Sequence, residues 1–195
     1  MKKWGLISVI AVLAFMSIGM YNGMVTGREG VTSQWAQVEN VYQRRADLIP
    51  NLVATVQQYA EFEKSTLIGV IDAPSKVSQI KIDAANATPE DLAKFQAAQG
   101  QLTSALSRLL VVAEQYPNLK ANENFMDLQK QLEGSENRIT VERQKFNDVA
   151  KGYNASIQQF PRSLVAGIFG FKTRPYFQAE AGADKAPDVN KLFDK

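Results

Sequence analysis

The sequence of 195 residues contains no cysteine and no histidine. The absence of cysteine excludes disulfides, thiolate nucleophiles and cysteine metal ligands. The absence of histidine excludes a Ser-His-Asp triad, a histidine-bound zinc site and any side chain that titrates near neutral pH without perturbation. A phosphate-binding glycine loop is missing as well. We therefore predict a protein that is not an enzyme, with no catalytic residue, no metal site and no cofactor.

A surplus of charge of one sign is also missing, because 22 Lys and Arg residues oppose 20 Asp and Glu residues. Lys2 and Lys3 account for the whole excess, and they precede the first apolar run. Nucleic acids are bound largely through neutralisation of their phosphates by basic side chains. The balanced charge of the rest of the chain therefore predicts that the protein has no nucleic-acid partner.

One long apolar run, Trp4–Met20, contains no charged residue. A membrane-spanning helix needs about 20 apolar residues, with a lower limit of about 17. We predict that residues 1–21 form an uncleaved single-pass anchor in the inner (cytoplasmic) membrane. Lys2 and Lys3 favour a cytoplasmic amino terminus, which places the body on the non-cytoplasmic side. The alternative is a cleaved signal peptide, for which Ser17-Ile18-Gly19 offers small residues at a suitable spacing.

The body, residues 22–177, shows helical periodicity and no alternating stretch typical of a half-buried strand. A first long helix is predicted from Val25 to Asp72, with apolar residues three and four positions apart. Pro50 lies inside it, and because proline lacks an N–H and clashes with the preceding turn, a kink or a short break is expected there. The segment Ser75–Asn86 is predicted to form a short helix.

Two further long helices have clear boundary signals. Thr88-Pro89-Glu90-Asp91 is a good helix start, and Tyr116-Pro117-Asn118 stops the same helix. The last helix is predicted from Asn122 to Gln159, where apolar residues follow one ladder of steps of three and four. The fold class is therefore all-α: an amino-terminal transmembrane helix followed by an elongated antiparallel bundle of three to four long helices.

Charged residues interrupt these apolar ladders at Arg45, Glu63 and Glu142. A charge inside a bundle is costly unless it is paired. We predict that Arg44 or Arg45 pairs with a carboxylate of the last helix, either Glu136 or Glu142, and that the pair aligns the helices. The alternative is that these long side chains reach solvent at the edge of the apolar face.

Several blocks of sequence resemble a known family of bacterial membrane proteins, the LemA family. The resemblance extends from about Tyr21 to Phe177 and is densest in the blocks Gln43–Val53 and Tyr116–Phe125. One departure is Phe62, near which the family often carries a histidine. The resemblance implies a single-pass envelope protein with a helical bundle, no established activity or cofactor, and no catalytic residues to transfer. The first block supplies interaction candidates: Arg44, Arg45, Asp47, Pro50 and Asn51.

The segment Ser163–Phe171 is apolar but too short to span a membrane. We favour a role in covering one end of the bundle. The alternative is an interfacial hook or a docking strip for a partner, which makes Phe169 and Phe171 interaction candidates. The polar residues 178–195 are predicted to form a flexible tail.

The function predicted from these features is that of a membrane-anchored scaffold or partner-binding module in the bacterial cell envelope. Its partners would be the membrane and another envelope protein, and the sequence also allows a homo-oligomer. Alternative functions are an envelope sensor, which would transmit shape changes along the first helix, and a lipid-interacting protein. A carboxylate-dependent hydrolase is the weakest alternative, because no spacing singles out a pair of acidic residues.

Overall fold

The computed structural model describes residues 2–58, 70, 80, 82–84 and 86–178, except the side chains of residues 2, 3, 6, 9 and 10. All regular secondary structure within these residues is helical, which confirms the all-α prediction. The helices are α1 (Lys2–Gln57), α3 (Pro89–Ala113), α4 (Pro117–Lys120), α5 (Glu123–Gln158) and α6 (Arg162–Phe169). The described part of the chain thus contains three long helices, as predicted.

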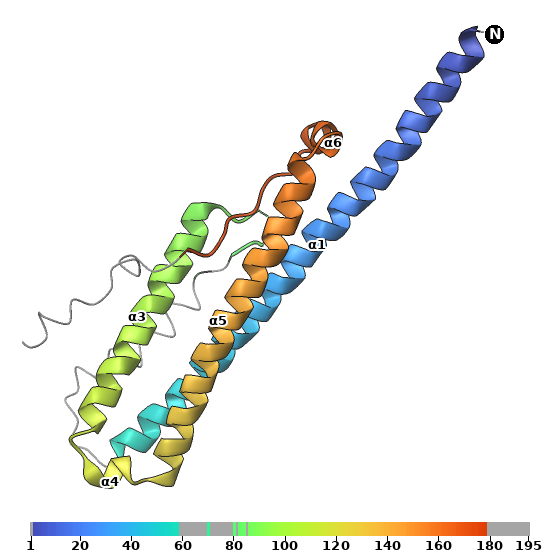
Figure 1. The fold of residues 1–195 in the computed structure, drawn as a ribbon. Helices are drawn as coiled ribbons and strands as arrows, with labels where there is room; N and C mark the ends of the chain where they lie inside the picture. Colours follow the sequence, from blue (N-terminus) through green and yellow to red (C-terminus); the bar gives the residue numbers. More distant parts are fainter. Residues whose placement is uncertain (1, 59–69, 71–79, 81, 85, 179–195) are drawn as a thin grey trace, which may run out of the picture.

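Helix α1 is the longest element, and its 56 residues span about 84 Å at 1.5 Å per residue. Its carboxyl-terminal part packs antiparallel to α5, and its amino-terminal part projects beyond the bundle (Figure 1). The helix continues through Pro50 without a break, so the predicted alternative of a short break is wrong. The helix predicted for residues 1–21 and the first helix of the body form one continuous element that begins at Lys2. The predicted extension to Asp72 falls mostly outside the described residues.

No helix is long and apolar enough to cross a membrane among the residues that the structure describes. Leu6, Val9 and Ile10 of the amino-terminal apolar run have side chains outside this set.

Helix α3 begins with the cap predicted at Thr88, and α5 begins next to Asn122, where its start was predicted. The Thr88 hydroxyl accepts a hydrogen bond from the Asp91 N–H at 3.1 Å, and the Asp91 carboxylate accepts one from the Thr88 N–H at 3.1 Å. This reciprocal pair satisfies two N–H groups at the helix start. At α5, the Asn122 side chain accepts from the Phe125 N–H at 3.0 Å. The single turn α4 joins the two antiparallel helices (Figure 1).

The short helix predicted at Ser75–Asn86 lies largely outside the described residues. The residues described there, Ile80, Ile82–Ala84 and Asn86, form turns and irregular structure, so the prediction is wrong for this part. Ile80, Ile82 and Ala84 pack against the core instead. The polar composition of the segment provides too few buried contacts to sustain a helix of its own.

The core consists of two hydrophobic clusters along the bundle. The upper cluster, near the amino-terminal part of α1, is built around Trp35, whose ring lies 5.4 Å from Phe95, 5.6 Å from Phe146 and 5.8 Å from Phe177. The lower cluster, near α4, contains mainly leucines, isoleucine and valines of α1, α3 and α5. The two clusters meet at a polar layer around Arg45.

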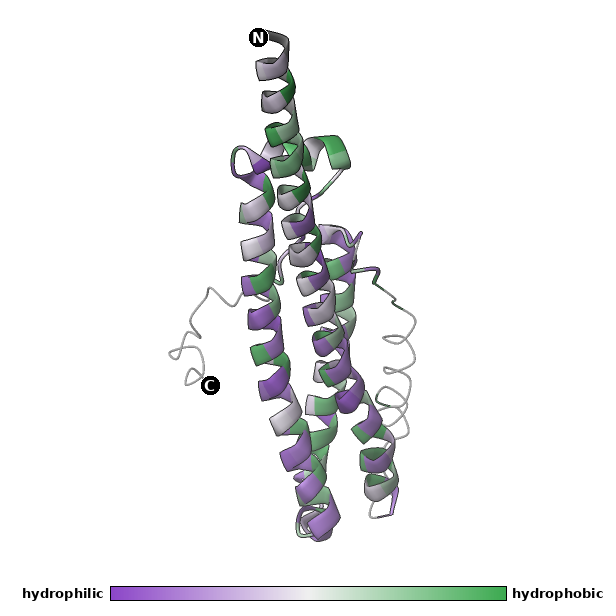
Figure 2. Ribbon diagram, turned by 90° about the vertical axis from the view of Figure 1, so that its right-hand side faces the viewer, coloured by the Kyte–Doolittle hydropathy of each residue, from purple (hydrophilic) through white to green (hydrophobic). Residues whose placement is uncertain are grey.

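Helix α6 folds back onto the upper end of the bundle. Val165 and Ala166 are buried there, so one face of the segment packs on the bundle, as a covering role requires. Gly170 then adopts the left-handed conformation, with φ of 72°, that lets the chain leave the helix sharply. The other face of α6 remains exposed, including Leu164 and Ile168, and Figure 2 shows this strongly hydrophobic helix beside the projecting part of α1.

Candidate functional site

Arg45 is the centre of the polar layer between the two core clusters, and only 2% of it is exposed. Its Nη1 donates to Glu136 Oε2 at 2.7 Å and to Thr103 Oγ1 at 3.0 Å, and its Nη2 donates to Gln99 Oε1. The guanidinium also lies 5.3 Å from the centre of the Tyr42 ring. Burial raises the pKa of the Tyr42 phenol. The predicted pair therefore exists, between Arg45 of α1 and Glu136 of α5. The hydrogen bonds to Thr103 and Gln99 add α3 to this layer.

The other members of the predicted pair take different roles. Arg44 is exposed on the surface of α1. Glu142 accepts hydrogen bonds from Gln34 at 2.7 Å and from Lys145 at 2.8 Å. The hydrogen bonds from Lys145 and Gln34 lower the pKa of the Glu142 carboxyl. Glu142 is thus a link at the edge of the α1–α5 interface and not a partner of either arginine.

The remaining candidates from the first family block do not join a site. Asp47, Pro50 and Asn51 are exposed on one side of α1, and Asp47 accepts a hydrogen bond from Gln43 at 2.6 Å. They form part of the accessible surface of α1. Glu63, the third charge on the ladders, lies outside the described residues.

A second feature, which the sequence did not predict, is an extended segment that we call the strap, residues 171–178. Two asparagines of α5 hold it by its backbone. Asn154 accepts from the Arg174 N–H at 2.7 Å and donates to the Arg174 carbonyl at 2.9 Å. Asn147 does the same with Phe177, at 2.8 and 3.0 Å. The two asparagines are seven residues apart, so they lie on one face of the helix, two turns from each other.

The strap carries one local signal that could have revealed it. Pro175 forces the preceding residue, Arg174, into an extended conformation. The amide pairing with Asn147 and Asn154 has no such signal, because it joins residues 20 and 30 positions apart. The strap ends against the bundle, where Gln96 donates to the Gln178 carbonyl at 2.9 Å.

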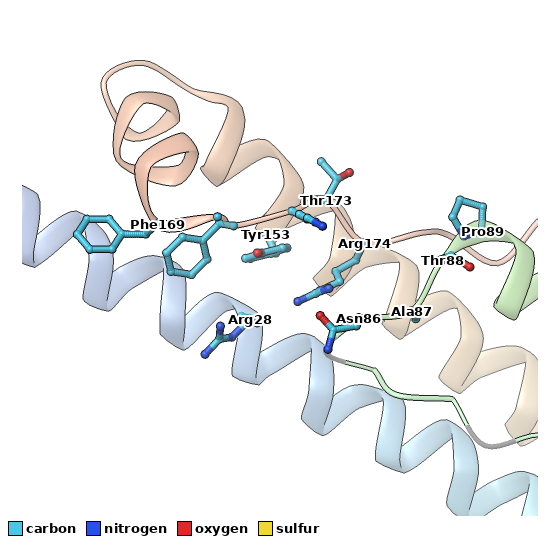
Figure 3. A pocket seen from close by; sticks show the side chains of 12 residues that line it. Arg28, Asn86, Ala87, Thr88, Pro89, Tyr153, Phe169, Thr173 and Arg174 are labelled. Atoms are coloured by element: carbon cyan, nitrogen blue, oxygen red, sulfur yellow. The ribbon is translucent and has the colours of Figure 1, made fainter.

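Between the strap and the helices lies a pocket of about 680 Å³, which we call the strap pocket (Figure 3). Its walls come from α1, α5, the start of α3, the end of α6 and the strap. The lining includes three cationic residues and three aromatic ones: Arg28, Lys172, Arg174, Tyr153, Phe169 and Phe171. Among the residues recorded in its lining there is no carboxylate. Phe169 and Phe171 are thus the only predicted interaction residues that the structure brings to a pocket of this size.

The arrangement of these sites suits binding and packing. Within the described residues no group of three metal-binding side chains lies together. The Arg45 layer fills a gap in the core with hydrogen bonds, whereas the strap pocket is open and cationic.

Comparisons with known proteins assign the chain to a family. The model of the LemA family matches residues 34–190. Magnetosome protein MamQ 2 of Paramagnetospirillum magneticum is 29% identical over 208 residues, covering 97% of this chain and 76% of the relative. MamQ of Magnetospirillum gryphiswaldense is 28% identical with the same coverage. Protein LemA of Metamycoplasma hominis is 24% identical, covering 89% of this chain and 75% of the relative. The chain belongs to the LemA family.

Proposed function

We propose that this chain is a non-enzymatic, membrane-anchored helical bundle that acts as a scaffold or partner-binding module in the bacterial cell envelope. The observation that carries the proposal is the exposed apolar surface of α1 where it projects beyond the bundle. Trp4 and Phe15 are each 78% exposed there. A soluble protein rarely leaves such a surface uncovered.

The exposed apolar side chains of this part of α1 point in several directions. Successive residues of a helix are turned by about 100°, so Val12, Leu13 and Ile18 lie on three different sides. All three are more than half exposed. A helix that packs on a protein core has one apolar stripe, whereas a helix surrounded by lipid is apolar all round. The pattern supports insertion of this part of α1 into the inner membrane as a single pass.

The orientation proposed from Lys2 and Lys3 can be tested by cysteine labelling. Because the chain has no cysteine, one introduced at the exposed Lys151 of α5 is unique. We expect Lys151→Cys to react with a membrane-impermeant maleimide in intact spheroplasts, as completely as after detergent lysis. Deletion of residues 2–21 should release the protein from the membrane fraction. Labelling only after lysis would show that the body lies on the cytoplasmic side. Membrane retention of the deletion variant would contradict the proposed anchor.

The scaffold role is supported by the shape of the bundle and by the absence of cysteine and histidine chemistry. Helix α1 joins the projecting segment to the bundle without interruption, so it would hold the bundle at a defined distance from the membrane (Figure 1). The exposed faces of the three long helices then offer a lateral surface for another envelope protein. Membership of the LemA family is compatible with this role.

The test is crosslinking of the full-length protein in cells, followed by mild membrane extraction and mass spectrometry. We expect one envelope protein to be recovered in near-equal amount. Its recovery should be lost when residues 22–177 are removed and the anchor is kept. Recovery of only self-crosslinks and abundant membrane proteins would contradict a scaffold for a separate partner.

A lipid-interacting role is the second candidate, and the exposed face of α6 favours it. Tyr21 of α1 lies 4.9 Å from the Phe169 ring, so α6 sits where α1 leaves the bundle. Phe160 and Ile168 are 81% and 79% exposed at this level. If α1 enters the membrane, α6 lies at the membrane surface.

A further inference from the structure

The strap pocket contains a buried cation for which the described part of the chain provides no counterion. Arg174 is only 7% exposed, and its Nε has no hydrogen-bond partner. Figure 3 shows its side chain extending from the strap toward Arg28 and Asn86. A buried charge is costly unless it is paired or hydrogen-bonded, because its low-dielectric surroundings do not compensate for the hydration that it loses. The protein therefore holds in this pocket a strong donor that lacks an acceptor.

A second buried donor without a partner lines the same pocket. Tyr153 is 3% exposed, and its hydroxyl makes no hydrogen bond within the described residues. Its ring packs against α1 at Gly27, where an added Cβ would lie only 3.2 Å from Tyr153 Cδ2. Burial raises the pKa of the Tyr153 phenol, while the charges of Arg174 and Arg28 lower it. The hydroxyl is thus a neutral donor close to both cations.

Aromatic rings hold both guanidinium groups in place. The Arg174 guanidinium lies 5.7 Å from the centre of the Tyr153 ring, and that of Arg28 lies 5.7 Å from the centre of the Phe171 ring. The backbone of Arg174 is clamped by Asn154. These contacts orient the cations before any ligand arrives, which reduces the entropy lost on binding.

The carboxylates nearest in sequence to the pocket residues do not line the pocket. Glu29 forms an ion pair with Arg28 at 3.6 Å, but its side chain is mostly exposed and does not line the pocket. Glu90, beside Pro89, is exposed and is absent from the lining as well. Asp83 accepts a hydrogen bond from Asn86 at 2.8 Å. Asp91 is occupied by Thr88 at the start of α3. The charged side chains recorded in the pocket lining are all cationic, so an anion entering it meets net positive charge.

We propose that the strap pocket binds a phosphate group, with Arg174, Arg28 and the Tyr153 hydroxyl donating to its oxygens. Guanidinium groups suit this task because their planar donors match the oxygens of phosphate and stay charged at all relevant pH values. The headgroup of an anionic lipid and free phosphate offer the same chemistry.

The apolar wall of the pocket favours the lipid headgroup of these two sources. Phe169 and Phe171 line the pocket, and both contact Tyr21 of α1, at 4.9 and 5.5 Å. This wall continues into the exposed face of α6, which provides an apolar surface for the acyl chains of a lipid. The choice of source rests on the proposed membrane anchoring, whereas the phosphate site does not.

The experiment uses the full chain purified in dodecyl maltoside, which is uncharged and contains no phosphate. Three probes are titrated separately: dihexanoyl phosphatidylglycerol, dihexanoyl phosphatidylcholine and inorganic phosphate. Calorimetry gives the affinity, and far-ultraviolet circular dichroism gives the unfolding temperature. We expect phosphatidylglycerol to raise this temperature by roughly 5–10 °C at a hundredfold excess over Kd.

Three variants of the site and one control variant test which residues bind the phosphate group. Arg174→Gln and Arg28→Gln should each weaken binding by roughly 10–100-fold, the loss expected for a hydrogen bond to a charged group. Tyr153→Phe should weaken binding without lowering the stability of the free protein, because its hydroxyl has no partner to lose. This variant keeps the test decisive if Arg174→Gln fails to fold. Lys130→Gln, an exposed cation of α5, is the matched control and should bind as the wild type does.

The outcomes distinguish the two sources of phosphate, and they also test the proposal itself. Binding of phosphatidylglycerol alone, lost in the site variants, supports a lipid headgroup. If inorganic phosphate binds as tightly as phosphatidylglycerol, and the same variants lose this binding, the result supports the site with free phosphate as its ligand. Equal binding of phosphatidylcholine that survives all variants would overturn the proposal in favour of a purely apolar surface. Absence of binding, or undiminished binding in Arg28→Gln and Tyr153→Phe, would also overturn it. Because detergent replaces the membrane, none of these results depends on the scaffold role.

Discussion

Replacement of Trp35 by alanine is expected to lower the free energy of unfolding by roughly 3–5 kcal/mol, the usual cost of removing a large aromatic side chain from a core. Trp35 contacts rings from three other segments: Phe95 of α3, Phe146 of α5 and Phe177 of the strap. The variant leaves a cavity where these segments meet. We therefore expect the strap to loosen together with the upper core cluster.

Urea unfolding of the full chain in detergent, followed by circular dichroism, measures this effect. Trp35→Phe is the informative control. It keeps a ring in the cluster and removes an indole N–H that is buried without a hydrogen-bond partner, so it should cost clearly less than the alanine variant, which leaves a larger cavity. Phe160→Ala, at a side chain that is almost fully exposed, should have no measurable effect. Equal stability of Trp35→Ala and the wild type would contradict the central place of Trp35 in the core.

Replacement of Arg45 by alanine is expected to lower the free energy of unfolding by roughly 2–4 kcal/mol. Removal of one partner of a buried pair generally costs about 3–5 kcal/mol. The lower estimate reflects Glu136, whose side chain is 51% exposed and can be hydrated when the arginine is gone. Gln99 is buried and would lose its donor, which costs about 1–3 kcal/mol of that total.

A double variant tests whether this layer serves stability or helix alignment. Arg45→Met with Gln99→Leu replaces the buried polar pair by apolar side chains of similar size, a change that is often neutral or stabilising. We expect it to restore at least wild-type stability in the same urea experiment. Changes in the distance between labels on α1 and α5 would then reveal loss of a single helix register. A stable Arg45→Ala variant would show that the pair contributes little.

Local features of the sequence were enough to predict the long helices, because helix starts and apolar periodicity depend on neighbouring residues. The short helices α4 and α6 were not predicted. Thr88 and Asn122 cap their helices where the sequence indicated. The short helix expected around Ile80 failed for the opposite reason. Its apolar residues do pack on the core, but they do so from an irregular segment and not from a helix.

The buried ion pair was predictable as a type of interaction but not as a specific pair. A charge on the apolar face of α1 had to find a partner, and this followed from the cost of burying it alone. The choice of Glu136 over Glu142 depends on how far α5 is displaced along α1, and helical periodicity carries no information about that displacement.

The sequence by itself determined the all-α class, the boundaries of α3 and α5, the need for a partner for Arg45 and the exclusion of cysteine and histidine chemistry. Only the tertiary structure decided the strap and its pocket. Arg28, Tyr153 and Arg174 come from segments far apart in the chain, and two asparagine side chains hold the strap by its backbone. Such contacts arise only when the helices and the strap pack together, so no local sequence pattern predicts them.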